Sequence, residues 1–334
     1  MRTIGLGNAL VDILLQLESD SILQEIGIQK GAMDMISEEQ MTAIRKAQEH
    51  REKSRTPGGS VCNSMRAMSY LGAASSFIGK IGSDSVGEYY EEAVRKAGVT
   101  PYFIKTEGIS GSCTVLISPD GERSMGTFLG PAATITPEEI GDDILHEHHY
   151  LYIEGYLVVN ESLMRGTMQK AKSLGLKVAL DLSNFNIVNA FKGLLENIIP
   201  QYVDILFSNE YEAKAFTGLE AEEAVLELAR IADIAVVTLG KRGALIACGN
   251  EVVHVEAEGR NPIDTTGAGD YFAAGFLYGQ TVGATPEQSG RIGSLLSKYV
   301  IDTIGPEIPE PHWEPIRSRV KEILTDITPK SRIS

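Results

Sequence analysis

Seven residues near the end of the chain have the types and order that an anion-binding loop with a general base requires. They read Asp264-Thr-Thr-Gly-Ala-Gly-Asp270 and lead directly into YFAAGFLYG, an apolar stretch typical of a buried helix. Small residues at a helix start leave backbone N–H groups free to meet an anion. The carboxylate of Asp270 would stand beside that anion and accept a proton from a hydroxyl group. From these residues alone, a simple helix cap is the alternative role for Asp270.

Four further segments place glycines and polar side chains after expected strands or at an expected helix start. They are Gly7-Asn8-Ala-Leu-Val-Asp12, Pro57-Gly58-Gly59-Ser-Val-Cys-Asn63, Asn209-Glu-Tyr-Glu212 and Thr238-Leu-Gly240-Lys-Arg-Gly243. Open α/β sheets bind ligands at the carboxyl ends of their parallel strands. We therefore expect these segments to meet Asp270 at one edge of a sheet. Taken separately, Asp12 also fits a turn at a strand end, and Asn209 with Glu212 also fits a helix start.

Strands alternate with helices over the second half of the chain, and several strands are apolar on both faces. Examples are YLYI at 150–153, VDILF at 203–207 and IAVVTL at 234–239. This pattern indicates an α/β fold, a doubly wound and mostly parallel sheet with helices on both faces. We predict one domain over residues 1–334. Earlier β segments predict a small β-sheet lid, at about 12–18, 33–36, 101–106 and 112–118.

Local signals add two helices and a turn before the alternating pattern begins. Residues 37–50 start with Ser and Glu and read as a helix, and 61–72 read as a helix that Gly72 ends. Between them, RTPGGS at 55–60 predicts a turn, because proline and glycines interrupt regular structure.

Composition excludes several classes of protein. Lys and Arg total 30 against 45 Asp and Glu, a formal net charge of −15, so we expect no nucleic-acid partner. The cysteines are scattered at 62, 113 and 248 without a CxxC pair, which argues against a disulfide framework or a zinc site. The chain has neither a convincing signal peptide nor an apolar run of about 18 residues. We expect a soluble, cytoplasmic protein with no membrane partner.

The paired GGxxxN and DTxGAGD patterns, in this order, resemble the signatures of the ribokinase-like (PfkB) carbohydrate and nucleoside kinases. The likeness runs from Ile4 to about Ile308 and, within the family, is greatest with adenosine kinases. The segments that carry it are GNALVD, GGSVCNS, ERSM, IEGYL, YVDILFSNEYEA and TTGAGD. It implies a ribokinase-like fold and transfer of the ATP γ-phosphoryl to the hydroxymethyl group of a ribose-containing acceptor.

The acceptor is left open between adenosine, which the resemblance favours, and a free sugar such as ribose or fructose. Thr266 stands where adenosine kinases often carry asparagine, and the lid positions around Phe128 differ from theirs. A more distant alternative is a non-catalytic ligand sensor with the same fold. The intact Asp270 and glycine loop argue against that sensor.

The resemblance also implies roles for individual residues. Asp270 would be the catalytic base, with Gly267, Ala268 and Gly269 as the anion hole and Arg123 reaching the transferring phosphoryl. The acceptor would contact Asn8, Leu10, Asp12, Met33, Met35, Gly58, Gly59, Asn63, Met125 and Tyr156. ATP would contact Asn209, Thr238, Gly240, Gly243 and Ser294.

Cofactors follow from the same resemblance. Asn209 and Glu212 match a motif that organises Mg²⁺ and phosphates through water. Asp264 and Thr266 match positions whose carbonyl groups bind a monovalent cation, K⁺, in ribokinases. Carbonyl ligands leave no side-chain trace, so the sequence does not decide whether this chain has that site. It also leaves open whether the protein is a monomer or a homodimer.

Overall fold

A large, twisted sheet forms the centre of the computed structural model, which describes residues 1–31, 33–48, 52–120, 122–258 and 262–326. Its strand order is β14-β13-β12-β11-β10-β9-β1-β5-β6. The strands from β12 to β6 in this order all pair in parallel. β13 pairs antiparallel with both of its neighbours, β12 and β14. The bounds are β1 (Arg2–Leu6), β5 (Ala74–Gly82), β6 (Thr100–Thr106), β9 (Tyr150–Glu154), β10 (Lys177–Asp181), β11 (Ile205–Asn209), β12 (Ile234–Thr238), β13 (Ala244–Cys248) and β14 (Glu251–Val255).

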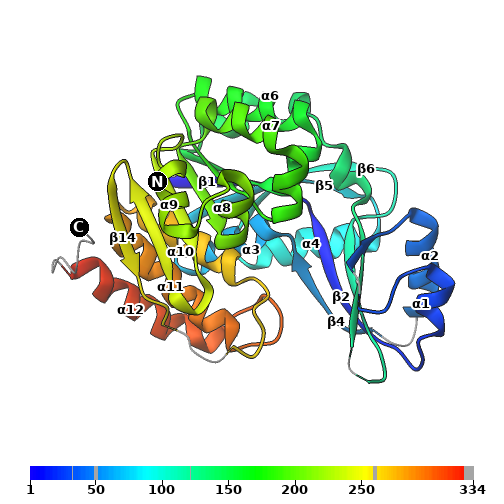
Figure 1. The fold of residues 1–334 in the computed structure, drawn as a ribbon. Helices are drawn as coiled ribbons and strands as arrows, with labels where there is room; N and C mark the ends of the chain where they lie inside the picture. Colours follow the sequence, from blue (N-terminus) through cyan, green and yellow to red (C-terminus); the bar gives the residue numbers. More distant parts are fainter. Residues whose placement is uncertain (32, 49–51, 121, 259–261, 327–334) are drawn as a thin grey trace.

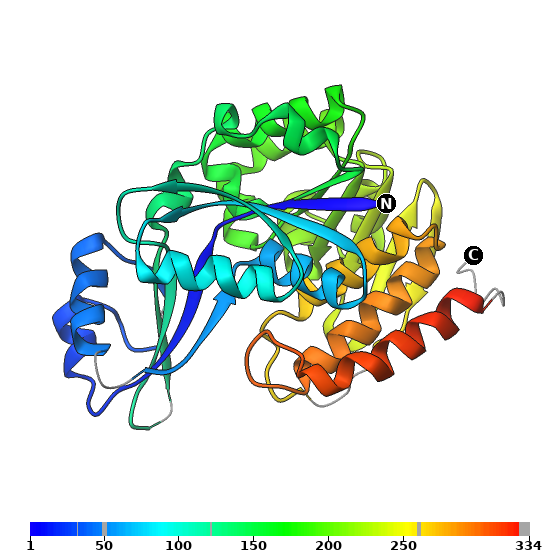
Figure 2. The ribbon, with the colours of Figure 1, turned by 180° about the vertical axis from the view of Figure 1, so that it is seen from behind.

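Helices cover both faces of the large sheet (Figures 1 and 2). One face packs on α3 (Ser60–Tyr70), α4 (Ser85–Lys96), α10 (Ala268–Thr281), α11 (Pro286–Ile301) and α12 (Trp313–Thr325). The other packs on α5 (Asp142–His146), α6 (Glu161–Ser173), α7 (Phe185–Tyr202), α8 (Glu210–Thr217) and α9 (Ala221–Leu228). Single turns lie at η1 (Gly130–Thr134), η2 (Pro137–Glu139), η3 (Gly155–Val159), η4 (Gly240–Arg242) and η5 (Glu310–His312). No helix among the described residues has the length and apolar character that crossing a membrane requires.

A smaller sheet stands to one side of this body (Figure 1). Its order is β3 (Met33–Met35), β8 (Arg123–Phe128), β7 (Ser112–Ile117), β2 (Leu10–Gln16) and β4 (Glu52–Gly58). Side chains of β2 alternate between buried and half-buried. The buried residues near its end, such as Leu15, pack on α1 (Ser21–Ile26) and α2 (Glu38–Gln48), which cover the outer face of the smaller sheet. The other face carries Asp12.

The lid prediction is wrong for residues 101–106. This segment is β6, which pairs in parallel with β5 at the edge of the large sheet. The reason is topological, because α4 forms the crossover that returns the chain beside β5. The smaller sheet instead includes β4 and β8, which the lid prediction lacked.

The turn predicted at 55–60 also differs from the structure. Residues up to Gly58 continue β4, which pairs antiparallel with β2. β4 is an edge strand, where the missing N–H of Pro57 is tolerated. The chain turns only at Gly59, directly before α3.

Candidate active site

Asp270 lies in the first turn of α10, at the carboxyl edge of the large sheet. Its Oδ1 accepts a hydrogen bond from Ser60 Oγ at 2.6 Å, and its Oδ2 accepts one from Asn63 Nδ2 at 2.9 Å. Ser64 Oγ donates to the Asp270 backbone carbonyl at 2.8 Å. These partners all belong to α3, and the carboxylate makes no described bond to the amides that start α10. The helix-cap alternative therefore does not describe what this side chain does.

Burial raises the pKa of Asp270, while the bonds from Asn63 and Ser60 act in the opposite direction. The effect of burial is the larger, so the pKa is raised overall and the carboxylate is a stronger base than an exposed aspartate. The geometry leaves the group fixed by two donors and more ready to accept a proton, which is what a general base needs.

The backbone amides at the start of α10 are not all available. Ala268 N–H donates to the carbonyl of Thr265 at 3.1 Å, so it is occupied in this conformation. Within the described chain, the amides of Gly267 and Gly269 have no protein acceptor. Space in front of Gly269 is open, since a Cβ built there would meet no atom within 4 Å. An anion would therefore meet Gly267 and Gly269 first.

Two adjoining hollows meet at Gly269. The first has a volume of about 280 Å³ and is lined by Ser60, Tyr156, Asp181, Ser183, Phe207, Ser208, Asn209, Glu212, Thr238, Gly269, Asp270 and Phe272. The second, of about 180 Å³, shares Thr238, Gly269 and Phe272 and extends to Gly240, Gly243 and Ser294. All the ATP-binding residues predicted from the sequence thus line one continuous surface beside Asp270.

Ser294 lines this surface and also holds the neighbouring backbone. Its Oγ donates to the carbonyl of Glu256 at 2.9 Å and accepts from Glu258 N at 3.2 Å. The hydroxyl therefore holds the chain that follows β14, and both of its hydrogen-bonding roles are taken by the backbone.

Asn209 and Glu212 form a capping box at the start of α8. Asn209 Oδ1 accepts from Glu212 N at 2.9 Å, and Glu212 Oε2 accepts from Asn209 N at 2.8 Å. Asn209 and Glu212 therefore do start a helix, as the alternative interpretation held. Both side chains also line the hollow beside Asp270. Burial raises the pKa of Glu212. Burial and the nearby Glu212 raise the pKa of Asp181, at the end of β10.

Asn8 is held by a buried carboxylate that the sequence analysis did not assign. The backbone N–H and Nδ2 of Asn8 both donate to Glu154 Oε1, at 2.9 and 2.5 Å. Glu154 Oε2 accepts from Val61 N at 3.4 Å, at the start of α3. Glu154 ends β9 and is 1% exposed. It therefore joins the end of β1 to the helix that positions Asp270.

Asp12 lies on the inner face of the smaller sheet, close to the two predicted glycines. Burial, reinforced by the charge of Asp270 and offset by Arg66, raises the pKa of Asp12 to about 7. A Cβ on Gly58 would lie 2.4 Å from Asp12 Oδ2, so only glycine leaves room for the carboxylate. Gly59 has φ +91°, and a Cβ there would lie 2.4 Å from the Asn8 carbonyl oxygen. The glycine pair brings Asn8, Asp12 and α3 together.

Leu10, Met125 and Tyr156 add apolar surface beside this site. Asp12 pairs with Cys113, and Cys113 pairs with Thr127, so these side chains share one face of the sheet. Leu10 and Met125, two positions away on β2 and β8, lie on that face and are half-buried. Met33 and Met35 lie on β3, beside β8, and Met35 is 64% exposed. Tyr156, 41% exposed, lines the hollow next to Asp270.

Arg123 and Asp264 connect the smaller sheet with the loop before α10. Arg123 Nη1 lies 3.9 Å from Asp264 Oδ2. Asp264 Oδ1 also accepts from the N–H and Oγ1 of Thr266, at 2.9 and 2.7 Å. Burial acts to raise the pKa of Asp264, but these bonds and the Gly305 N–H outweigh it and lower the pKa. Arg123 is thus placed beside the loop that precedes α10, 46% exposed, rather than in contact with Asp270.

A stability measurement tests the buried state of Glu154. Burial raises the pKa of Glu154 from 4.5 to about 7, so the folded protein keeps a proton that the unfolded chain loses across this window. The free energy of unfolding therefore falls as pH rises from about 4.5 to 7, by about 3 kcal/mol for a shift of this size. We expect Glu154→Gln to raise Tm relative to the parent protein at pH 8, with a smaller effect at pH 5.

Glu25→Gln, at an exposed position of α1, is the matched control and should change Tm little at either pH. Equal shifts for Glu154→Gln at pH 5 and pH 8 would contradict the buried, proton-holding state of Glu154.

Residues 32–313 match the family model described as pfkB family carbohydrate kinase. The chain belongs to the PfkB family. It is a phosphotransferase with an alcohol group as acceptor, and the family uses ATP as phosphoryl donor.

Solved structures extend the likeness over nearly all of this PfkB kinase. A probable sugar kinase from Rhizobium etli is 30% identical with a TM-score of 0.83, covering 95% of this chain and 98% of that one. An adenosine kinase from Sinorhizobium meliloti is 32% identical with a TM-score of 0.81, covering 96% and 98%. By sequence comparison alone, an adenosine kinase from Saccharomyces cerevisiae is 30% identical, covering 75% of this chain and 79% of the relative. The relatives thus include both nucleoside and sugar kinases.

Three polar residues of the PfkB site were missed by the sequence analysis: Ser60, Glu154 and Asp181. Glu154 and Asp181 each end an apolar parallel strand, so an acidic residue at such a position was an available signal. Ser60 lies inside the GGSVCN segment, but nothing in the spacing showed that its hydroxyl would reach Asp270.

Proposed function

We propose that the protein transfers the γ-phosphoryl of ATP to the hydroxymethyl group of a ribose-containing acceptor, with adenosine as the first candidate. One observation carries this proposal. The Asp270 carboxylate, fixed by Ser60 and Asn63, faces a hollow that also meets the open amide of Gly269. A base and an anion site are therefore placed at the same point.

The chemistry follows from this placement. Asp270 accepts the hydroxyl proton while the acceptor oxygen bonds to the γ-phosphorus, and the bond from that phosphorus to the β–γ bridging oxygen breaks to release ADP. The amides of Gly267 and Gly269, at the positive end of α10, stabilise the negative charge on the transferred group. Asn8, Asp12 and Asn63 orient the sugar hydroxyls.

The donor set beside Asp270 fits a magnesium ion held through water and phosphate. No group of three or more His, Cys, Asp and Glu side chains is placed to hold a metal directly, within the residues that the structure describes. Glu212, Asp181 and Asn209 nevertheless supply oxygen atoms to one hollow, and Mg²⁺ commonly keeps waters and binds substrate phosphates. When bound, Mg²⁺ neutralises phosphate charge. The two carboxylates would hold its waters and orient the nucleotide.

Arg123 is proposed to act when the smaller sheet closes over the acceptor as a lid. Its guanidinium lies near Asp264, in the loop before α10, and closure would carry it to the transferring phosphoryl. A guanidinium can make paired, charge-assisted bonds to phosphate oxygens. Closure would also exclude water, which competes as a phosphoryl acceptor.

Arg123→Ala tests this role. We expect kcat to fall by about 10-fold or more and the acceptor KM to change much less, because the guanidinium acts on charge that develops in the transition state. Arg319→Ala, an exposed arginine on α12, serves as the control and should leave both constants unchanged. A rise in KM with an unchanged kcat would instead assign Arg123 to acceptor binding.

A free sugar is the second candidate acceptor. The similar structure from Rhizobium etli is a probable sugar kinase, and Asn8, Asp12 and Asn63 would serve a free sugar as well as a nucleoside. A screen over nucleosides and free sugars, following ATP consumption and identifying the phosphorylated product, tests the proposed function. Lack of transfer to any acceptor with a hydroxymethyl group would contradict it.

A further inference from the structure

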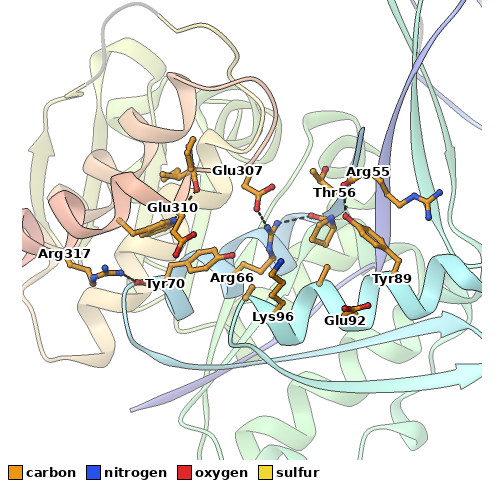
Figure 3. A pocket seen from close by; sticks show the side chains of 16 residues that line it. Arg55, Thr56, Arg66, Tyr70, Tyr89, Glu92, Lys96, Glu307, Glu310 and Arg317 are labelled. Atoms are coloured by element: carbon orange, nitrogen blue, oxygen red, sulfur yellow. Dashed lines mark hydrogen bonds and ion pairs between the residues drawn. The ribbon is translucent and has the colours of Figure 1, made fainter. Parts of the chain in front are cut away.

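A second cavity lies away from Asp270, between α3, α4, β4 and the start of α12 (Figure 3). Its volume is about 750 Å³, within the range of small-molecule sites. Tyr70 and Tyr89 supply half-buried aromatic surface, and Pro309 adds exposed apolar surface. Trp313, which is 2% exposed, and Pro57 also border the cavity but are buried. Tyr70 and Trp313 lie with ring centroids 4.9 Å apart. These walls suit a flat, apolar molecule.

A buried cation lines the same cavity. The Arg66 side chain is only 3% exposed, with Nη1 donating to the Pro57 carbonyl at 3.1 Å and Nη2 to Glu307 Oε1 at 2.8 Å. Its Nε is buried and has no hydrogen-bond partner. A buried donor without an acceptor is costly, and this cost falls on the wall of the cavity.

Charge on the cavity wall limits what it can bind. The cationic groups are Arg55, Arg66, Lys96 and Arg317, and the carboxylates are Glu92, Glu307 and Glu310. Glu307 is paired with Arg66, and Arg317 is paired with Glu314, which lies outside the cavity wall. Lys96, by contrast, forms no ion pair within the described chain and is available to an anion. A single available cation, with carboxylates on the same wall, favours a ligand with one negative charge over a polyphosphate.

We propose that this cavity is a second small-molecule site, for a flat ring system that carries one anionic group. The ring lies against Tyr70, Tyr89 and Pro309, and the anionic group pairs with Lys96 beside Arg66. The site shares α3 and β4 with the catalytic side, where Asn63 holds Asp270 and Gly58 packs on Asp12. A ligand there would contact the elements that position both carboxylates.

The experiment uses 8-anilinonaphthalene-1-sulfonate, a fluorescent aromatic monoanion, with the full-length protein. Trp313 is the only tryptophan in the sequence, and its ring lines the cavity, so its emission reports on this place. We expect saturable binding of one probe molecule with quenching of Trp313 emission. The assay contains neither ATP nor acceptor, so its result does not depend on the proposed function.

Two variants locate the bound probe. Lys96→Met removes the unpaired charge, and Ala93→Phe fills the cavity from α4. Each should weaken probe binding at least about 10-fold, a change of about 1.4 kcal/mol. Lys321→Met, at an exposed position of α12, is the matched control and should bind the probe like the parent protein. Parent-like binding by both cavity variants, with parent-like circular dichroism and Tm, would overturn the proposal.

Discussion

Asp270→Asn is expected to reduce kcat by at least about 100-fold, because the carboxamide cannot accept the proton of the acceptor hydroxyl. ATP affinity should stay close to that of the parent protein, since Gly267 and Gly269 offer backbone amides that the substitution does not alter. The measurement is steady-state kinetics with the acceptor found in the screen, together with nucleotide titration of the variant.

The local structure can accommodate this substitution. Asp270 accepts from Ser60 and Asn63, so the new carboxamide keeps one acceptor and gains a donor. Asn63 Oδ1 is buried without a partner, and a flip of the Asn63 amide would present it to that new donor. Circular dichroism and Tm close to those of the parent protein are therefore expected. Asp143→Asn, at an exposed position of α5, is the matched control for loss of one carboxylate.

A pH profile separates loss of the base from loss of shape. Burial raises the pKa of Asp270, so kcat of the parent protein should increase as pH rises through that pKa and the carboxylate forms. The residual kcat of Asp270→Asn should not show this rise with pH. An Asp270→Asn protein with near-parent kcat would show that another group accepts the proton.

The meeting of Asp270 with Asn63 was predictable, although 207 residues separate them. Both belong to glycine-containing segments next to expected helices, and the parallel-sheet rule brings such segments to one edge. Glu154 was harder to predict, since its role depends on contact with Asn8, 146 residues away. Pairing of this kind is decided by tertiary packing, which no local pattern records.

The smaller sheet shows a second limit of sequence reasoning. β2 and β4 pair antiparallel across a long intervening segment that contains α1 and α2. Pro57 and Gly58 resemble a turn locally, yet the close approach of Gly58 to Asp12 needs them in the strand. The sequence likewise could not show that the Ala268 amide is occupied. This amide donates to the carbonyl of Thr265 in a local turn instead of facing an anion.

Adenosine is expected to be phosphorylated with a kcat/KM about 50-fold or more higher than that of ribose, since about 1.4 kcal/mol corresponds to a factor of ten. Asn8, Asp12 and Asn63 can contact the sugar of either acceptor, but only the nucleoside carries a base. Leu10 and Met125 lie on the same face of the smaller sheet as Asp12 and leave apolar surface beside the site. Burying about 100 Å² of purine against such surface contributes about 2.5 kcal/mol, at about 25 cal/mol per Å².

Met125→Ala makes the comparison specific to the base. Methionine packs well on a flat, polarizable ring, so the substitution should lower kcat/KM for adenosine by about 10-fold and leave any activity toward ribose unchanged. Leu219→Ala, on a partly exposed residue beyond α8, should alter neither. Equal losses for both acceptors would mean that Met125 supports the lid rather than the base. Phosphorylation of ribose or fructose without detectable phosphorylation of adenosine would contradict the nucleoside proposal and leave a PfkB sugar kinase, because the Asp270 chemistry is common to both acceptors.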